Sequence, residues 1–265
     1  MKWTWALYGF SSATTLPDLL KRCDTYVMQH SARYQVDESH NHIHSRHVLH
    51  YAKEIIKRRG STPYEILLSS LGSMLHDVPD SKYVDHPSYV LEQALDFILP
   101  ASMQDTVGAD LALIIPLISF SKTVSKDPLS DRLLFSLPQE LGDFPHVESY
   151  HIIREADLLS SYNTKRTLLY RMHKSNFTKS HQEVLSEARE LYTERMAKLR
   201  SSGLFLLPEA ERGLACPLEH LSSTTWATSP SSFDTWEDML THFNLDPVEP
   251  WEKTLEDVDT LFRHA

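Results

Sequence analysis

The sequence predicts an all-α fold, and three observations support this. Apolar residues recur at helical spacing along most of the 265 residues. Two segments open with the Ser/Thr-x-x-Glu pattern of a capping box, from Thr62 to Glu65 and from Ser180 to Glu183. The chain has only 7 glycines, which argues against a loop-rich all-β protein, and it has neither a G-x-G-x-x-G nor a P-loop pattern.

Each expected helix has a local reason. The first two carry continuous apolar stripes. The third has Thr62 as N-cap and Pro63 as its first residue, and its broad apolar face predicts a central position. A later helix should kink at Pro116, and the proline-rich segment 123–146 predicts a long loop with a short helical insert. The predicted helices span residues 16–30, 43–58, 62–76, 86–99, 105–119, 147–173, 180–200, 234–243 and 250–264.

The Ser/Thr/Pro-rich segment "SSTTWATSPSS" (222–232) predicts a linker. It divides the chain into a helical-bundle domain, residues 1–221, and a linker with a small helical C-terminal extension, residues 222–265. The extension contains Trp226, Trp236 and Trp251. Aromatic residues of this kind are expected to pack on the main domain, with packing against a second subunit of a homodimer as the alternative.

Composition excludes several classes of protein. The net charge of −10 disfavours binding of nucleic-acid polymers, which requires a basic surface. Cys23 and Cys216 are the only cysteines, which is typical of a reducing compartment. The start "MKWTWALYGF" lacks the apolar core of a signal peptide, and the longest apolar stretch, 111–120, is too short to cross a membrane. The sequence therefore predicts a cytoplasmic protein.

Several polar, metal-competent side chains occur within apolar helices. The run "SLGSMLHDVPDSKY" (70–83) ends its apolar part in His76 and Asp77, and Asp157 lies beside the apolar face of a later helix. Buried imidazole and carboxylate groups are costly unless a partner satisfies them. They are either hydrogen-bonded structural residues or ligands of a cation held in the core of a bundle.

The segment "SHNHIHSRHVLHYA" (39–52) adds a third helix. His40, His44 and His47 fall at i, i+4 and i+7, on one helix face, and two histidines at such spacing can converge on one metal ion. The alternative is a solvated, histidine-rich start of a helix.

The order of these motifs resembles that of the HD-domain metal-dependent phosphohydrolases. The similar motifs are "SHNHIHSRHV" (39–48), "MLHDVPDSKY" (74–83), "IIPLISFS" (114–121) and "EADLLSS" (155–161). The resemblance spans roughly residues 15–215 and implies an HD-type helical bundle. Its subgroup includes nucleoside triphosphate pyrophosphohydrolases and nucleotidases.

The resemblance implies four metal ligands, namely His44, His76, Asp77 and Asp157. Mixed nitrogen and oxygen ligands with open positions favour one divalent ion, Mn²⁺ before Ni²⁺, Fe²⁺, Co²⁺ or Zn²⁺. Such an ion would activate water and polarise a phosphoryl group. A single ion is expected because His86 is the only histidine between residues 77 and 145, and it precedes a proline as a helix cap would.

The expected catalytic residues surround these ligands. Asp80, or Asp77 itself, would accept the proton of the attacking water. Phosphoryl transfer also needs positive charge, for which Lys82 is the first choice. The expected substrate-binding residues, each alternatively a solvated side chain, are His40, His47, Ser119, Lys122 and Arg154.

The expected function is therefore metal-dependent hydrolysis of a small phosphorylated metabolite, best a nucleotide or (deoxy)nucleoside triphosphate. Two departures leave the exact substrate open. The family favours Arg where this chain has His47, and the stretch after Asp157, "LLSSYNTKRTLLYR", lacks the usual glycine. The alternatives are an inactive HD-like protein that binds nucleotides for regulation, and a structural helical protein with incidental histidines.

Overall fold

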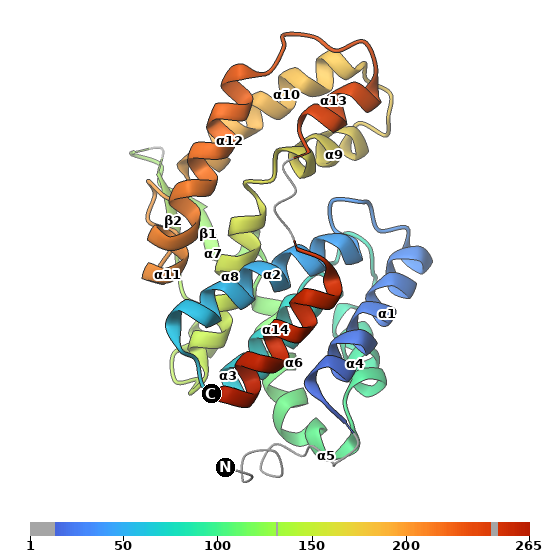
Figure 1. Cartoon of the computed structure of the whole chain (residues 1–265), viewed down its shortest axis with the longest axis vertical. Coiled ribbons are helices and arrows are strands. Elements are labelled where there is room, and N and C mark those ends of the chain that lie inside the picture. Colours follow the sequence, from blue (N-terminus) through green and yellow to red (C-terminus); the bar gives the residue numbers. More distant parts are fainter. Residues whose placement is uncertain (1–13, 131, 245–248) are drawn as a thin grey trace.

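The computed structural model describes residues 14–130, 132–244 and 249–265, and these are helical almost throughout. Figure 1 shows two groups of helices, with α1 to α8 and α14 in one group and α9, α10, α12 and α13 at one end of it. The all-α prediction is confirmed for these residues. The longer helices are α1 (Leu16–Tyr34), α2 (His42–Arg59), α3 (Pro63–Leu75), α4 (Pro87–Ile98), α8 (Val147–Ser160), α9 (Thr164–Lys174), α10 (His181–Glu194), α12 (Cys216–Thr228), α13 (Trp236–His242) and α14 (Trp251–His264).

No described helix combines the length and the apolar character that crossing a membrane requires. The expected absence of a signal peptide concerns residues 1–10, which lie outside the described part of the chain.

Helix α3 lies at the centre of the core, as its apolar face predicts. The side chain of Thr62 caps the backbone N–H of Glu65, and the Glu65 carboxylate in turn accepts from the backbone N–H of Thr62, which completes the predicted capping box. All ten residues from Ile66 to Leu75 are buried. The helix contacts α1, α2, α6, α8 and α14, so the direction in which it ends is fixed from several sides.

Helices α3 and α8 approach closely at Gly72. A Cβ atom at this position would lie 2.3 Å from Cδ1 of Ile153 and 3.6 Å from Cδ2 of Leu111. Both helices carry a predicted ligand four residues later, His76 after Gly72 and Asp157 after Ile153. The close approach therefore sets how near these two ligands can come.

The structure corrects two predicted helices. The segment 147–173 forms two helices, because Asn163 accepts a hydrogen bond from the backbone N–H of Arg166 and starts a new helix, α9. The segment 105–119 begins as a π-helical turn (Gln104–Gly108), continues as α6 (Ala109–Ile114) and then tightens into a 3₁₀ turn (Ile115–Leu117) at Pro116.

The predicted long loop contains a small hairpin. Short helices α5 (Ala101–Met103) and α7 (Phe120–Thr123) precede it. Strands β1 (Val124–Lys126) and β2 (Leu133–Phe135) pair antiparallel, with Val124 opposite Phe135. A 3₁₀ turn, Gln139–Leu141, is the expected short helical insert.

Residues 222–228, predicted as linker, are helical. The helix α12 crosses the expected boundary at residue 221, and its threonine hydroxyls are satisfied within the helix, as in Thr224 to the carbonyl of His220. It follows α11 (Pro208–Ala210) and a π-helical turn (Glu211–Ala215). The Trp226 ring is buried, with its centroid 4.5 Å from that of Phe243, and this anchors the helix.

The C-terminal residues pack back on the preceding helices, as predicted for their tryptophans. Besides Trp226, Trp236 contacts the ring of His181, and Trp251 lies under the guanidinium of Arg46. Helix α14 contacts α1, α2 and α3, whereas α13 lies beside α9 and α10 in the other group of helices (Figure 1).

Candidate metal centre

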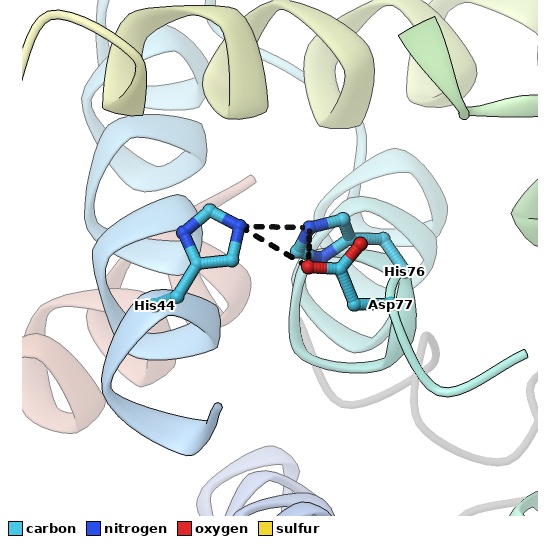
Figure 2. Close-up of side chains that lie close together, drawn as sticks. All are labelled: His44, His76 and Asp77. Atoms are coloured by element: carbon cyan, nitrogen blue, oxygen red, sulfur yellow. Dashed lines mark hydrogen bonds and ion pairs between the residues drawn. The ribbon is translucent and has the colours of Figure 1, made fainter. Parts of the chain in front are cut away.

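Three predicted ligands meet where α2 and α3 come together. His44, His76 and Asp77 each offer one ligand atom, and these atoms all lie within 4.8 Å of one another (Figure 2). The Nε2 atoms of the two histidines are 3.2 Å apart, and Asp77 Oδ2 is 3.4 Å from one and 3.3 Å from the other. Adjacent ligands of an ion with bonds of about 2.1 Å lie roughly 3–3.5 Å apart, so the spacing fits.

Asp157 reaches the same point from α8. Its Oδ1 lies 3.3 Å from Nε2 of His44 and 3.9 Å from Nε2 of His76. The structure thus brings together all four side chains expected as ligands, from three helices. We call His44, His76, Asp77 and Asp157 the metal group.

The start of α2 and a local hydrogen bond at the end of α3 orient these side chains. Helix α2 begins at His42 because the side chain of Asn41 accepts the backbone N–H of Ile43, and this puts His44 in the first turn. His76 follows the last residue of α3, and its Nδ1 donates to the carbonyl of Ser73 at 2.9 Å. That bond leaves Nε2 to face the metal group.

The donors and acceptors in the metal group favour positive charge at its centre. Arg166 can only donate, so Nε2 of His44, 3.0 Å from its Nη2, must present a lone pair. The bond to Ser73 leaves Nε2 of His76 with a lone pair when His76 is neutral and with a donatable proton when it is charged. Asp77 Oδ2 is buried and lies 3.4 Å from Nε2 of His44 and 3.3 Å from Nε2 of His76. Either a proton on His76 or a divalent ion in its place would supply the charge that these groups share.

The electrostatics favour positive charge at the same point. Burial alone would raise the pKa of Asp77, but the fields and hydrogen bonds of His76 and His44 hold it well below its usual range. Burial lowers the pKa of His76, yet the neighbouring Asp77 and Asp157 raise it to about 9. Burial and Arg166 lower the pKa of His44, which keeps its imidazole neutral as a ligand must be.

His40 lies near the metal group but not on the predicted helix face. The cap at Asn41 starts α2 after it, which corrects the expectation that His40, His44 and His47 share one face. His40 Nδ1 lies 2.8 Å from Ser39 Oγ and 3.3 Å from Asp37 Oδ1, and its ring is 6.2 Å from that of His44. His47 is half-buried further along α2.

Asp80 and Lys82 follow the metal group in a turn. The backbone N–H of Asp80 donates to the carbonyl of Asp77, and Lys82 Nζ lies 3.0 Å from Asp80 Oδ2. The Lys82 side chain is 63% exposed, so it can reach a ligand in solvent. Burial of its amine lowers the pKa of Lys82, but Asp80 and Asp77 raise it overall.

Three expected substrate-binding residues make other contacts. Ser119 and Lys122 are exposed, and Lys122 Nζ donates to the carbonyl of Pro116 at 2.8 Å. Arg154 is 3% exposed, and its Nη2 donates to Glu155 and to the carbonyl of Leu204, both at 2.8 Å. The charge of Arg154 is thus used inside the core, and its expected role in substrate binding stays a prediction.

Sequence reasoning missed Arg166, which approaches the metal group most closely among the cations. Its Nη1 lies 3.6 Å from Asp157 Oδ1, in addition to its bond to His44. Arg166 lies in the stretch "LLSSYNTKRTLLYR", which departs from the HD pattern. The signal that could have found it is Asn163, a good N-cap residue two positions before a Lys-Arg pair.

No protein-family model, curated protein or solved structure matches the chain.

Proposed function

We propose that the protein is a metal-dependent phosphohydrolase that acts on a small phosphorylated metabolite, best a nucleotide. The proposed ligands of one divalent ion, preferably Mn²⁺, are the four side chains of the metal group. The resemblance to HD-domain phosphohydrolases motivates the reaction class. We place the protein in the cytoplasm, because both of its cysteines are free thiols.

One observation carries this proposal. Nε2 of His44, Nε2 of His76 and one oxygen each of Asp77 and Asp157 converge on one place from three helices, at the separations that ligands of a single ion have. Incidental histidines on separate helices would have no reason to meet two carboxylates in the core. This convergence supports a bound cation over the alternative of incidental histidines.

The surrounding residues have roles in phosphoryl transfer. Once bound, the ion supplies Lewis-acid polarisation of the phosphoryl group and activation of water. The carboxylate of Asp80 would accept the water proton, and it is held by Lys82 beside the metal group. The guanidinium of Arg166 would donate to the equatorial oxygens of the transferred group.

The test is hydrolysis of a panel of nucleotides and phosphate esters with Mn²⁺. Wild-type protein should hydrolyse at least one compound, and Asp77→Ala should lower kcat/KM by at least about 100-fold, because it removes a ligand. Asp96→Ala changes an exposed carboxylate on α4 and should have wild-type activity. The proposal fails if wild type and Asp77→Ala are indistinguishable on every compound.

A second candidate function is nucleotide binding without turnover. The observation that favours it is Arg166, which donates to the very nitrogen of His44 that an ion needs. Isothermal titration calorimetry with metal present, followed by product analysis, distinguishes a hydrolase from a protein that only binds nucleotides. Binding of a nucleotide without any product would support the binding protein.

A further inference from the structure

Arg166 is held rigidly at the edge of the metal group. Its Nε donates to the carbonyl of Ser39 and its Nη1 to Ser160 Oγ, both at 2.9 Å, while Nη2 lies 3.0 Å from His44. These partners come from three separate parts of the chain. The guanidinium therefore has a fixed plane beside the place where the first phosphate would bind.

A second arginine, Arg195, lies at the end of α10. Its guanidinium carbon is 3.8 Å from the centre of the Phe120 ring, at the start of α7. Among the described residues, no carboxylate forms an ion pair with it, and its buried Nε has no hydrogen-bond partner. A half-buried arginine with unused donors is unusual, because desolvating a charge without a partner is costly.

The packing of α10 against α9 places Arg195, which directly follows α10, on the side of the metal group, because α9 carries Arg166. Burial lowers the pKa of Arg195, Asp157 and Tyr170 raise it, and Arg166 lowers it further. Tyr170 lies on α9, one turn after Arg166, and α9 packs against α10. The Tyr170 ring also contacts that of His40, 6.3 Å away, beside the metal group.

The charge balance leaves Arg195 available to an anion. A divalent ion would compensate Asp77 and Asp157, and Lys82 pairs with Asp80. No described acid is then left for Arg195. The guanidinium lies over the Phe120 ring, and an arginine supported by an aromatic ring offers a planar fork of donors that matches phosphate oxygens.

We infer that Arg195, supported by Phe120, is a second anion subsite that binds the phosphate adjoining the one at the metal group. The site would therefore select compounds with two or more linked phosphates over phosphate monoesters. This inference rests on the proposed function. In the reaction, water adds to phosphorus and gives a proton to a nearby carboxylate. The bond from phosphorus to the bridging oxygen breaks, and that oxygen leaves with the bonding electron pair on the phosphate held by Arg195.

The test is calorimetric titration of the Mn²⁺-loaded protein with imidodiphosphate and with orthophosphate. Wild-type protein should prefer imidodiphosphate. Arg195→Met should weaken imidodiphosphate binding by about 10- to 100-fold and change orthophosphate binding by less than about threefold, because one charge-assisted contact is lost. Arg212→Met removes an exposed arginine elsewhere and should bind as wild type does.

The inference is overturned if wild type shows no preference, or if Arg195→Met weakens both anions equally or neither. Arg195→Lys keeps the charge without the fork and should lie between wild type and Arg195→Met. If Arg195→Met does not fold by circular dichroism, Arg195→Lys and Phe120→Leu decide, and both should weaken imidodiphosphate selectively.

The two proposals fail in different ways. If imidodiphosphate binds in an Arg195-dependent manner but wild type hydrolyses nothing, the subsite stands and the enzymatic function falls. If wild type hydrolyses monophosphates and Arg195→Met has unchanged anion selectivity, the function stands and the subsite falls.

Discussion

Individual buried charges in this protein find partners inside the core. Glu155 is fully buried and accepts hydrogen bonds from the backbone N–H groups of Leu206, at 2.8 Å, and Leu207, at 3.1 Å. Burial raises the pKa of Glu155 to about 7, although Arg154 and these N–H groups oppose the shift. The pair fixes the segment before α11 to α8, so the residues next to Asp157 serve the fold.

Burial also favours the neutral form of His30, although the pKa shift has the opposite direction. His30 is 6% exposed, its ring lies 4.7 Å from that of Tyr34, and neither ring nitrogen has a hydrogen-bond partner among the described residues. Burial, with a contribution from Arg33, lowers the pKa of His30 to about 4. The unfolded chain, with a histidine pKa of about 6.5, therefore takes up the proton first as pH falls.

Stability should decrease on acidification because of His30. Its contribution is full above about pH 6.5 and is lost as pH falls towards 4. Between pH 7.5 and 5.0, wild-type protein should lose about 1–2 kcal/mol more unfolding free energy than His30→Phe, measured by urea denaturation. His86→Phe changes an exposed histidine and should follow wild type. Equal pH dependence of wild type and His30→Phe would contradict the assignment.

At the level of elements, caps, apolar stripes and the change of helix type at Pro116 were predictable from sequence, whereas the break at 161–163 was not. The capping boxes at Thr62 and Ser180 start α3 and α10 as predicted. The break at 161–163 was missed because no glycine or proline marks it. The linker prediction for 222–228 failed because the burial of Trp226 outweighs the weak helix propensity of serine and threonine.

The residues of the metal group were predictable from sequence, whereas the two arginines near them were not. His44, His76, Asp77 and Asp157 lie within short motifs, and the structure brings them together. The metal itself stays a prediction. The positions of Arg166 and Arg195 depend on the orientation of α9 and α10. Tertiary packing sets that orientation, because both helices follow the break that was missed. Local sequence patterns contain no information on that orientation.

The crossing of α3 and α8 should be sensitive to one methyl group. Gly72→Ala would place its Cβ against Ile153, which is fully buried and has little room to move. We expect a loss of about 1–3 kcal/mol in unfolding free energy, because the helices must separate or Ile153 must leave its rotamer. Mn²⁺ affinity, measured by calorimetry, should fall as well, because His76 moves away from Asp157.

Gly213→Ala is the matched control for this change. Its added Cβ would lie at an ordinary contact distance of 3.4 Å from Arg58. This variant should stay within about 0.5 kcal/mol of wild type. If both alanine variants behaved alike, the close approach at Gly72 would not matter for stability.

For the whole molecule, a buried lysine joins the C-terminal residues to the first helices. Lys53 on α2 is 2% exposed and forms ion pairs with Glu249, with Asp257 at 3.4 Å and with Glu54 at 3.3 Å. His50 Nδ1 also lies 3.4 Å from Glu249. These contacts attach α14 across helices that precede it by about two hundred residues.

Lys53→Met should loosen this attachment. The variant keeps the apolar stem but leaves Glu249 and Asp257 without their buried partner, and we expect a loss of about 1–3 kcal/mol in urea denaturation. Lys253→Met removes the other lysine bound to Asp257, at 2.5 Å and 53% exposed, and should cost less than about 0.5 kcal/mol. Similar losses for both variants would show that burial of Lys53 adds nothing.

The position of α14 has a consequence during protein synthesis. Leu255, Val258 and Phe262 are buried in the packing of α14 on helices that the ribosome makes first. Until α14 emerges, those early helices expose apolar surface and form a state prone to aggregation. The nascent chain should therefore complete this packing only after α14 has emerged, and chaperones that cover apolar surface would assist it most before then.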